Sequence, residues 1–326
     1  MDGRGVPLSI IVTGAHRHDA SLGVLLAVVN VGVLIYFIHH VSVSIQANQI
    51  VARVGKELIA GLDRLFPEHI GQGAPQIPKE PPDDNFLDKF EREARPICFK
   101  GDGYIQFIDA DALIDLAIEA DVVIRLERRP GQYVVAGCPL VLVWPGNRDI
   151  DELSGEVNSA FAWGNQRAPG QDVEFAVNQL VEVAVRALFP GVNDPFTAIT
   201  CVDRLGSALS RLATRDWPSP YRHDKQETLR VIACIATFSD ITDAAFNQIR
   251  QYGQSSAAVM IRLLETIAVI AGFAKRPEDR AALLRHAEMI VRGARNSLSE
   301  AEDRQVVEER FQITIQLCGN SGKQGP

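Results

Sequence analysis

The chain has 326 residues, of which 46% are hydrophobic and 23% are charged, a composition typical of a folded protein with room for two modest domains. Its 41 acidic and 33 basic residues give a formal net charge of -8, without a dense run of Lys and Arg. These values exclude a broad cationic surface, so we expect no nucleic-acid partner. The five cysteines lie far apart without a CxxC pair, which predicts free thiols in a reducing compartment and no metal site.

An uncharged apolar run, Ala20–Ile38, follows a polar lead over residues 1–19. As a helix, this run would span about 28 Å, close to the hydrocarbon thickness of a bilayer. We therefore predict a transmembrane helix over residues 20–40. The alternative is a buried core helix.

One face of the run carries Gly23, Ala27 and Asn30, a combination of small and polar residues that is typical of helix association inside membranes. We therefore expect a homo-oligomer. The membrane orientation stays open, because the two basic residues before the span are matched by two that follow it: Arg4, Arg17, Arg53 and Lys56.

Apolar residues continue with helical spacing beyond the span, which predicts a stalk helix over residues 41–67. Its apolar stripe, if exposed on a lone helix, would favour self-association. A segment rich in Pro and Gly then predicts a mobile linker over residues 68–95. The stripe consists of Val51, Val54, Leu58, Leu62 and Leu65.

After the linker the hydrophobic period becomes alternating, which predicts a small β-rich module over residues 96–146 with one short helix, Ala110–Ala120. The run PGQYVVAGCPLVLV in this module resembles the hairpins of biotin- and lipoyl-carrier domains. No lysine occurs between Gly101 and Gly146, so we expect no cofactor. The expected strands are Ile97–Lys100, Tyr104–Ile108, Val122–Glu127, Tyr133–Val135 and Leu140–Trp144.

The remaining chain predicts an α-helical domain over residues 147–318, followed by a disordered tail over residues 319–326. Its densest part is a helical hairpin, in which one helix ends near Leu188 and the next begins at Pro195 with Asp194 as its N-cap. The fold class expected is therefore α+β with a membrane anchor and a mostly helical C-terminal domain. The later helices are expected at Thr228–Tyr252, Ser256–Phe273, Glu278–Arg295 and Glu300–Leu317.

Polar residues gather in and before this hairpin and form our candidate ligand site. Glu182 precedes Arg186 by four residues, which places the two on one helix face, and an anion would be stabilised at a helix N-terminus. The structural alternative is that Asp194 only caps its helix and the Arg and Glu side chains only satisfy one another. No catalytic residue is assigned, because no known catalytic signature occurs. The candidate ligand residues are Arg167, Gln171, Asp172, Glu182, Arg186, Asn193, Asp194, Thr197 and Arg204.

Several stretches between about Val31 and Tyr252 resemble a known family: YFIHHVSVSIQ, GYIQFIDADAL, ERRPGQYVVAGCPL, the QR of GNQRAPGQD, and RALFPGVNDPFTAITCVDRLG. They resemble the bacterial predicted membrane proteins grouped as domain of unknown function 2254. The resemblance implies a bacterial inner-membrane protein. Because the free cysteines predict a reducing compartment, we expect its soluble part in the cytoplasm. It also implies further transmembrane helices before the first residue, so the chain is expected to be truncated at its start. The resemblance implies no activity or substrate.

From these observations we expect an oligomeric sensing, regulatory or channel-associated module anchored in a lipid bilayer. Besides the bilayer and further copies of the chain, we expect the module to bind a small ligand or anion. The rival hypothesis is a membrane-surface enzyme with its active site at Arg186, Asn193 and Asp194.

Overall fold

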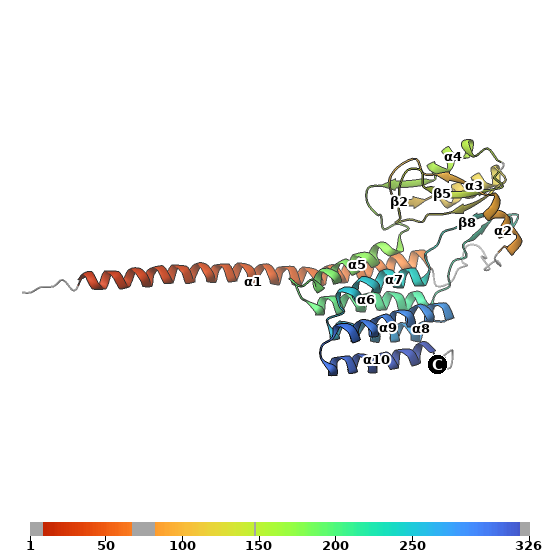
Figure 1. The fold of residues 1–326 in the computed structure, drawn as a ribbon. Helices are drawn as coiled ribbons and strands as arrows, with labels where there is room; N and C mark the ends of the chain where they lie inside the picture. Colours follow the sequence, from red (N-terminus) through yellow and green to blue (C-terminus); the bar gives the residue numbers. More distant parts are fainter. Residues whose placement is uncertain (1–8, 67–81, 147, 320–326) are drawn as a thin grey trace, which may run out of the picture. The chain divides into compact units, whose positions relative to one another are not determined.

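The computed structural model describes residues 9–66, 82–146 and 148–319, with the side chains of residues 9–22 and 37–48 left out (Figure 1). The chain divides into two compact units, Met1–Ile50 and Val51–Pro326. Helix α1 (Ser9–Leu65) supplies the described part of the first unit and contributes its last residues to the second.

In the first unit, the described apolar side chains of residues 23–36 are exposed, among them Val24, Leu25 and Tyr36. The ends of the predicted span Ala20–Ile38, residues 20–22 and 37–38, lie outside the described side chains. Within the described residues, no helix combines the length and the apolar content that a membrane crossing requires.

The predicted stalk does not stand alone. From Val51 onward the apolar stripe of α1 is buried in a helical core, where Val51, Val54, Leu58 and Leu62 pack among residues of the later helices. The expectation of an exposed stripe was therefore wrong, because the helices that cover it come from more than a hundred residues further along the chain. The clearest such contact is made by Arg215, whose Nη1 donates to the Leu62 carbonyl oxygen at 3.1 Å.

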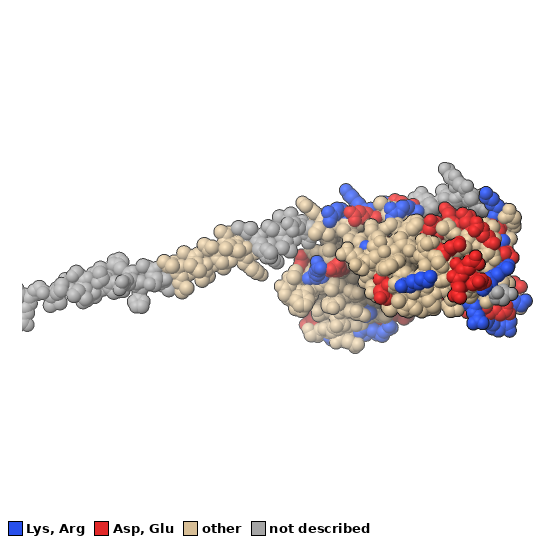
Figure 2. Space-filling view, turned by 90° about the horizontal axis from the view of Figure 1, so that it is seen from above, with Lys and Arg blue, Asp and Glu red and all other residues tan. Residues whose placement is uncertain are grey.

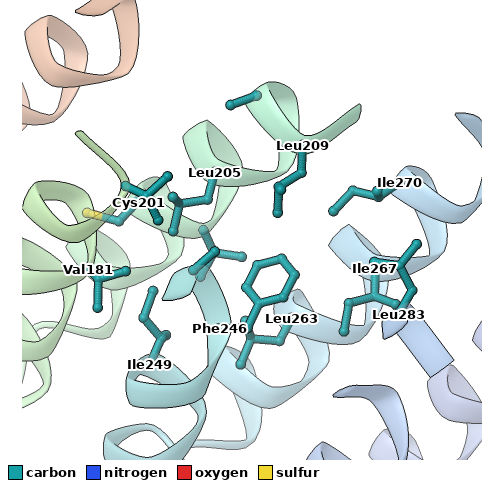
Figure 3. Close-up of a cluster of buried hydrophobic side chains, with 14 of the residues drawn as sticks. Val181, Cys201, Leu205, Leu209, Phe246, Ile249, Leu263, Ile267, Ile270 and Leu283 are labelled. Atoms are coloured by element: carbon teal, nitrogen blue, oxygen red, sulfur yellow. The ribbon is translucent and has the colours of Figure 1, made fainter. Parts of the chain in front are cut away.

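The helical core is a bundle in which α1 packs with the C-terminal helices. Its centre is filled by interdigitated aliphatic side chains around Phe246, as Figure 3 shows. Two of its helices form the predicted hairpin, with Asp172 capping the first and Asp194 capping the second. The helices are α5 (Val173–Leu188), α6 (Pro195–Thr214), α7 (Phe238–Tyr252), α8 (Ala257–Phe273), α9 (Pro277–Ser297) and α10 (Ala301–Gly319).

The β-rich part contains a five-stranded sheet with the order β1-β5-β3-β8-β7 and a three-stranded sheet with the order β4-β2-β6. All five predicted strands and the predicted helix are present, with bounds shifted by a few residues. The strands are β1 (Arg95–Cys98), β2 (Gly103–Ile108), β3 (Val123–Leu126), β4 (Tyr133–Val134), β5 (Pro139–Trp144), β6 (Phe161–Gly164), β7 (Tyr221–His223) and β8 (Leu229–Ile232), and the accompanying helices are α2 (Asp84–Glu93), α3 (Ala110–Glu119) and α4 (Ile150–Ser159).

The helix predicted at Thr228–Tyr252 was wrong in its first third. Within that part, Leu229–Ile232 form strand β8, which pairs in parallel with β3, with Ile124 opposite Val231. Helix α7 begins only at Phe238, behind a capping box formed by Thr237 and Asp240. Tertiary pairing therefore decides the conformation of a short apolar stretch that local spacing assigned to a helix.

Two other segments differ from the predicted organisation. Helix α2 and the start of β1 occupy the second half of the predicted linker, where Phe90 is fully buried against the sheet. Strands β6, β7 and β8 lie in the part predicted to be helical. Residues 67–81 of the linker and 320–326 of the tail lie outside the described residues. The fold is thus α+β, with more helix than strand.

The surface carries charges of both signs (Figure 2). Acidic side chains gather on the face where α2, α3 and α4 flank the sheets.

Candidate functional site

A cavity of about 300 Å³ lies where the β-rich part meets the helical bundle. Its wall is mostly aliphatic, and its polar groups come from the turn after β3, from the start of α5 and from β7. A volume of this size is at the small end of the range for ligand sites. The lining residues are Leu65, Phe66, Ile108, Ala110, Leu113, Ile114, Leu126, Arg129, Pro130, Gln171, Asp172, Val173, Glu174, Pro218, Arg222, Val231, Ala233, Cys234, Ile235 and Ala236.

The first polar contact of the site joins Arg167 to Asp172 in a bidentate ion pair. Arg167 Nε lies 2.7 Å from Asp172 Oδ2, and Nη2 lies 2.9 Å from Oδ1. The same carboxylate caps α5 by accepting a hydrogen bond from the backbone N–H of Glu174 at 3.1 Å. Only 3% of the Asp172 side chain is exposed, so these hydrogen bonds replace those that water would otherwise make to the carboxylate.

The second contact is a bridge made by Arg129, which ties the β-rich part to two helices of the bundle. Its Nη2 lies 2.5 Å from Glu174 Oε1 on α5, and its Nη1 lies 3.1 Å from Asp240 Oδ2 on α7. Asp240 is fixed in turn, because it accepts a hydrogen bond from the Thr237 backbone N–H at 2.9 Å within the capping box. Three segments distant in sequence therefore meet at one guanidinium group.

Two features connect the start of α5 to its neighbours: the close approach of the turn at Gly131, and the contacts of the Gln171 side chain with the end of β2. Gly131 has a φ of 89°, and a Cβ atom there would lie 2.2 Å from Asp172 Oδ2, so the close approach requires glycine. Gln171 joins the other side, since its Oε1 accepts from the Ile108 N–H at 2.9 Å and its Nε2 donates to the Ile108 carbonyl at 3.1 Å. The mouth of the cavity is thus framed by fixed groups.

Burial dominates the electrostatics of the cavity. It raises the pKa of Glu174 despite the opposing effect of Arg129, and it lowers the pKa of Arg222. For Asp240, burial alone would raise the pKa, but the hydrogen bonds from Thr237 and Arg129 outweigh it and the pKa is lowered. Burial also raises the pKa of Cys234, so its thiol is not activated as a nucleophile.

The structure divides the predicted site residues into two groups. Gln171 and Asp172 line the cavity at the N-terminal end of α5, and Arg167 is paired with Asp172. The other six lie along α5 or beyond it, with the turn to α6 about 24 Å away at the helical rise of about 1.5 Å per residue. These six are Glu182, Arg186, Asn193, Asp194, Thr197 and Arg204.

The distant group makes contacts of a structural kind. Arg186 pairs with Glu182 at 2.5 Å on the exposed face of α5. Asp194 Oδ1 accepts from the Thr197 N–H at 3.1 Å, and its Oδ2 accepts from the Thr197 hydroxyl at 2.6 Å. Arg204 extends along α1, where a Cβ atom on Gly55 would lie 3.2 Å from the Arg204 Cδ.

Three charged residues that line the cavity were not among the predicted site residues, Arg129, Glu174 and Arg222, and neither was Asp240, which pairs with Arg129. A signal for one of them exists, because Thr237 and Asp240 have the spacing of a capping box and mark the start of α7. Arg129 carries no such local signal, since its contacts with Glu174 and Asp240 are made across the fold. Arg222 donates to the carbonyl oxygen of Ser219, three residues earlier.

The comparisons with known proteins agree with the resemblance of the motifs. The pattern of a family described as "Predicted membrane protein (DUF2254)" matches residues 8–269. Uncharacterized protein Rv1290c of Mycobacterium tuberculosis is 31% identical over 291 residues, covering 86% of this chain and 53% of that protein. Uncharacterized protein Mb1321c of Mycobacterium bovis matches with the same identity and coverage.

This chain therefore spans about half the length of the curated relatives it matches. No solved structure matches it. The family match covers most of the chain and includes the cavity residues from both the β-rich part and the bundle. The chain belongs to the DUF2254 family of predicted membrane proteins.

Proposed function

We propose that the protein is a membrane-anchored sensing or regulatory module and that the cavity between the β-rich part and the bundle binds its ligand. The ligand class is a small amphipathic anion. Its apolar body would contact the aliphatic wall, and its acidic group would lie near Arg222. Because the lining comes from both parts of the fold, a bound ligand would stabilise their junction.

The observation that carries this proposal is the cavity of about 300 Å³ framed by Arg129 and Asp172. Its size favours a single small metabolite over a dinucleotide. Arg222 lines the cavity, and burial lowers its pKa, so an anionic ligand beside it would favour the charged form of its guanidinium.

Thermal unfolding of the full chain in detergent tests the proposal, with octanoate and inorganic phosphate as probes. We expect octanoate to raise the Tm, since a ligand that binds only the folded state stabilises it, and phosphate alone to have a smaller effect. The substitution Ala233→Leu fills the cavity and should abolish the shift. Ala112→Leu, on the exposed face of α3, is the matched control and should preserve it.

Two outcomes would overturn the ligand proposal. One is an equal octanoate shift in the Ala233→Leu variant, which would place binding elsewhere. The other is the absence of any shift, together with native mass spectra of the purified chain that contain no bound small molecule.

The anchor in this proposal is the apolar run Ala20–Ile38. It is supported by membership in a family of predicted membrane proteins and by the uncharged character of the run. We expect the full chain to fractionate with membranes and to need detergent for extraction. Recovery in the soluble fraction without detergent would contradict the anchor and leave the cavity to be judged separately.

Self-association remains part of the proposal with narrower support. The stripe of α1 that suggested it is buried within the chain's own bundle, so only the face of Gly23, Ala27 and Asn30 still favours an oligomer. The mass of the detergent-corrected particle by light scattering tests this, and a monomer would contradict it.

The rival hypothesis places an enzyme active site at Arg186, Asn193 and Asp194. Both carboxylate oxygens of Asp194 already accept hydrogen bonds from Thr197, and Arg186 is paired with Glu182. These contacts favour the cavity as the functional site.

A further inference from the structure

Part of the cavity wall is formed by three residues that are far apart in the sequence: Phe66, Pro218 and Ala236. All three have the same neighbour, Trp217, which does not itself line the cavity. The centroid of the Trp217 ring lies 4.8 Å from that of Phe66, and its Nε1 donates to the Ala236 carbonyl oxygen at 3.1 Å. Pro218 directly follows it in the chain. The indole therefore lies behind this part of the wall and supports it.

The indole ring is held in turn by a cation. The Cζ atom of Arg276 lies 4.4 Å from the centroid of the Trp217 ring, a distance at which a guanidinium is attracted to an aromatic face. Arg276 is fixed by Asp279, whose Oδ2 accepts from Nη2 at 2.6 Å and from Nε at 2.9 Å. Only 2% of the Asp279 side chain is exposed. Because the cation is bound to a buried carboxylate, the indole has fixed neighbours beyond the wall as well as within it.

Phe66 is also fixed, because its backbone is bound by the buried side chain of Arg215. Nη1 of Arg215 donates to the carbonyl oxygens of Leu62 and Phe66 at the C-terminal end of α1. Its Nη2 pairs with Asp63 on the same helix. Phe66 therefore cannot retreat from the cavity without breaking contacts on both its backbone and its ring.

A wall that is supported in this way sets how far the apolar part of a ligand can extend. Protein interiors are close-packed, so a ligand chain longer than the cavity would have to displace Phe66 and the indole behind it. The cavity of about 300 Å³ is at the small end of the range for ligand sites, so a chain of moderate length would already reach this limit. The aromatic side chains would then decide which chain length fits.

We propose that Trp217 is the positioning residue that limits the length of the ligand's apolar chain. It acts through Phe66, which contacts the ligand, and it makes the cavity selective for amphipathic acids about as long as octanoate. This inference rests on the function proposed above, in which the cavity binds a small amphipathic anion.

Equilibrium dialysis of the full chain in detergent tests the proposal, with octanoate and decanoate as probes and protein-free micelles as the reference. The quantity compared is the ratio of the Kd for decanoate to the Kd for octanoate. Burial of one methylene improves affinity about fourfold, so without a length limit decanoate would bind about fifteenfold more tightly than octanoate. In the native chain we expect decanoate to bind no more tightly than octanoate.

The substitution Trp217→Leu keeps an apolar side chain and frees space behind Phe66, so decanoate should gain about tenfold relative to octanoate. Trp217→Phe frees less space and should give a gain of about fourfold in the same direction, which keeps the test available if the leucine variant does not fold. The matched control is Trp144→Leu, which should leave the ratio unchanged. Trp144 also packs against an aromatic ring, that of Phe86, and its Nε1 also donates to an oxygen, that of Glu93, but it does not line the cavity.

A role in stability alone would weaken the binding of both acids by the same factor and leave their ratio unchanged. That result in the Trp217→Leu and Trp217→Phe variants would overturn the proposal, and so would an equal change of the ratio in the Trp144→Leu variant.

The native chain separates the two levels of inference. If it binds neither acid above the micelle reference, the proposed function fails and the role of Trp217 fails with it. If it binds octanoate but binds decanoate about fifteenfold more tightly, the proposed function stands and only the length limit is lost.

Discussion

The carboxylate of Asp172 accepts two hydrogen bonds from the Arg167 guanidinium, at 2.7 and 2.9 Å, while the same group caps α5. One buried side chain thus fixes the start of the helix that separates the cavity from the turn to α6. Its surroundings allow two predictions to be made with matched controls, and two further predictions concern Asp194 and His286.

The first prediction concerns this ion pair. Replacing Asp172 by Ala should lower the free energy of unfolding by about 3 kcal/mol, because it removes a helix cap and leaves the Arg167 charge without its main partner. The control is Glu182→Ala, which breaks the exposed pair with Arg186 and should cost about 0.3–0.5 kcal/mol. Denaturant titration of both variants measures the difference, and equal costs would contradict the role given to Asp172.

The second prediction compares two glycines with similar backbone angles. Gly131 and Gly137 have φ values of 89° and 86°, so alanine would be strained at either position. A Cβ at Gly137 meets nothing within 4 Å, whereas one at Gly131 would lie 2.2 Å from Asp172 Oδ2. Gly137→Ala should therefore cost about 1–2 kcal/mol, and Gly131→Ala distinctly more.

Unfolding temperatures of these two variants provide the measurement. The excess cost at Gly131 should shrink when Asp172 is also replaced by Ala, because the clashing carboxylate is then absent. An excess that persists in the double variant would assign it to the turn itself.

The third prediction concerns Asp194 at the start of α6. Asp194→Ala should cost about 0.5–2 kcal/mol, and Asp194→Ser should recover most of that because serine caps nearly as well. If the carboxylate also contacts a ligand or another subunit, the serine variant should regain the Tm and still lack the activity or binding of the native chain. Full function in the serine variant and in Asn193→Ala would show that this turn is structural.

The fourth prediction is a pH dependence from His286 on α9. This side chain is fully buried, and burial lowers its pKa from 6.5 to about 4 despite the nearby Asp243. Its Nε2 lies 2.8 Å from Asp243 Oδ1, but neither ring nitrogen makes a well-directed hydrogen bond within the described residues. Arg285 and Arg250 also face it and oppose its protonation.

A lowered histidine pKa means that the unfolded chain binds the proton first as the pH falls. The contribution to stability is therefore intact above about pH 6.5 and is lost between pH 6.5 and 4, by about 3 kcal/mol in total. In the His286→Leu variant, the free energy of unfolding should fall less steeply between pH 6.5 and 4, whatever the effect of the substitution at neutral pH. An unchanged slope between pH 6.5 and 4 in that variant would assign the dependence to other groups.

The parts of the fold that could be predicted from sequence are those set by local signals. The Asp194-Pro195 start of α6 and the alternating strands of the β-rich part depend on neighbouring residues, and the structure confirms them. The burial of Val51 and Leu58 and the strand at Leu229–Ile232 depend on partners far along the chain, so spacing alone could not reveal them.

The same distinction applies to the candidate site. Arg167, Gln171 and Asp172 could be singled out because they precede a helix start, and they do line or frame the cavity. Arg129 could not, because its partners Glu174 and Asp240 come from two helices that sequence spacing does not bring together. The predicted site residues lie at both ends of α5 because the sequence analysis assigned the polar residues before, along and after this helix to a single site.

The pairing of β8 with β3 has a consequence for how this protein can be cut or recombined. The five-stranded sheet takes three strands from residues before α5 and two from residues after α6, so any contiguous stretch of the gene that encodes the sheet also encodes α5 and α6. A fusion or deletion boundary placed between the β-rich part and the bundle would separate β8 from the edge of β3 that it covers. Exchange of the five-stranded sheet between relatives would therefore require transferring the whole stretch from β1 to β8 as one unit.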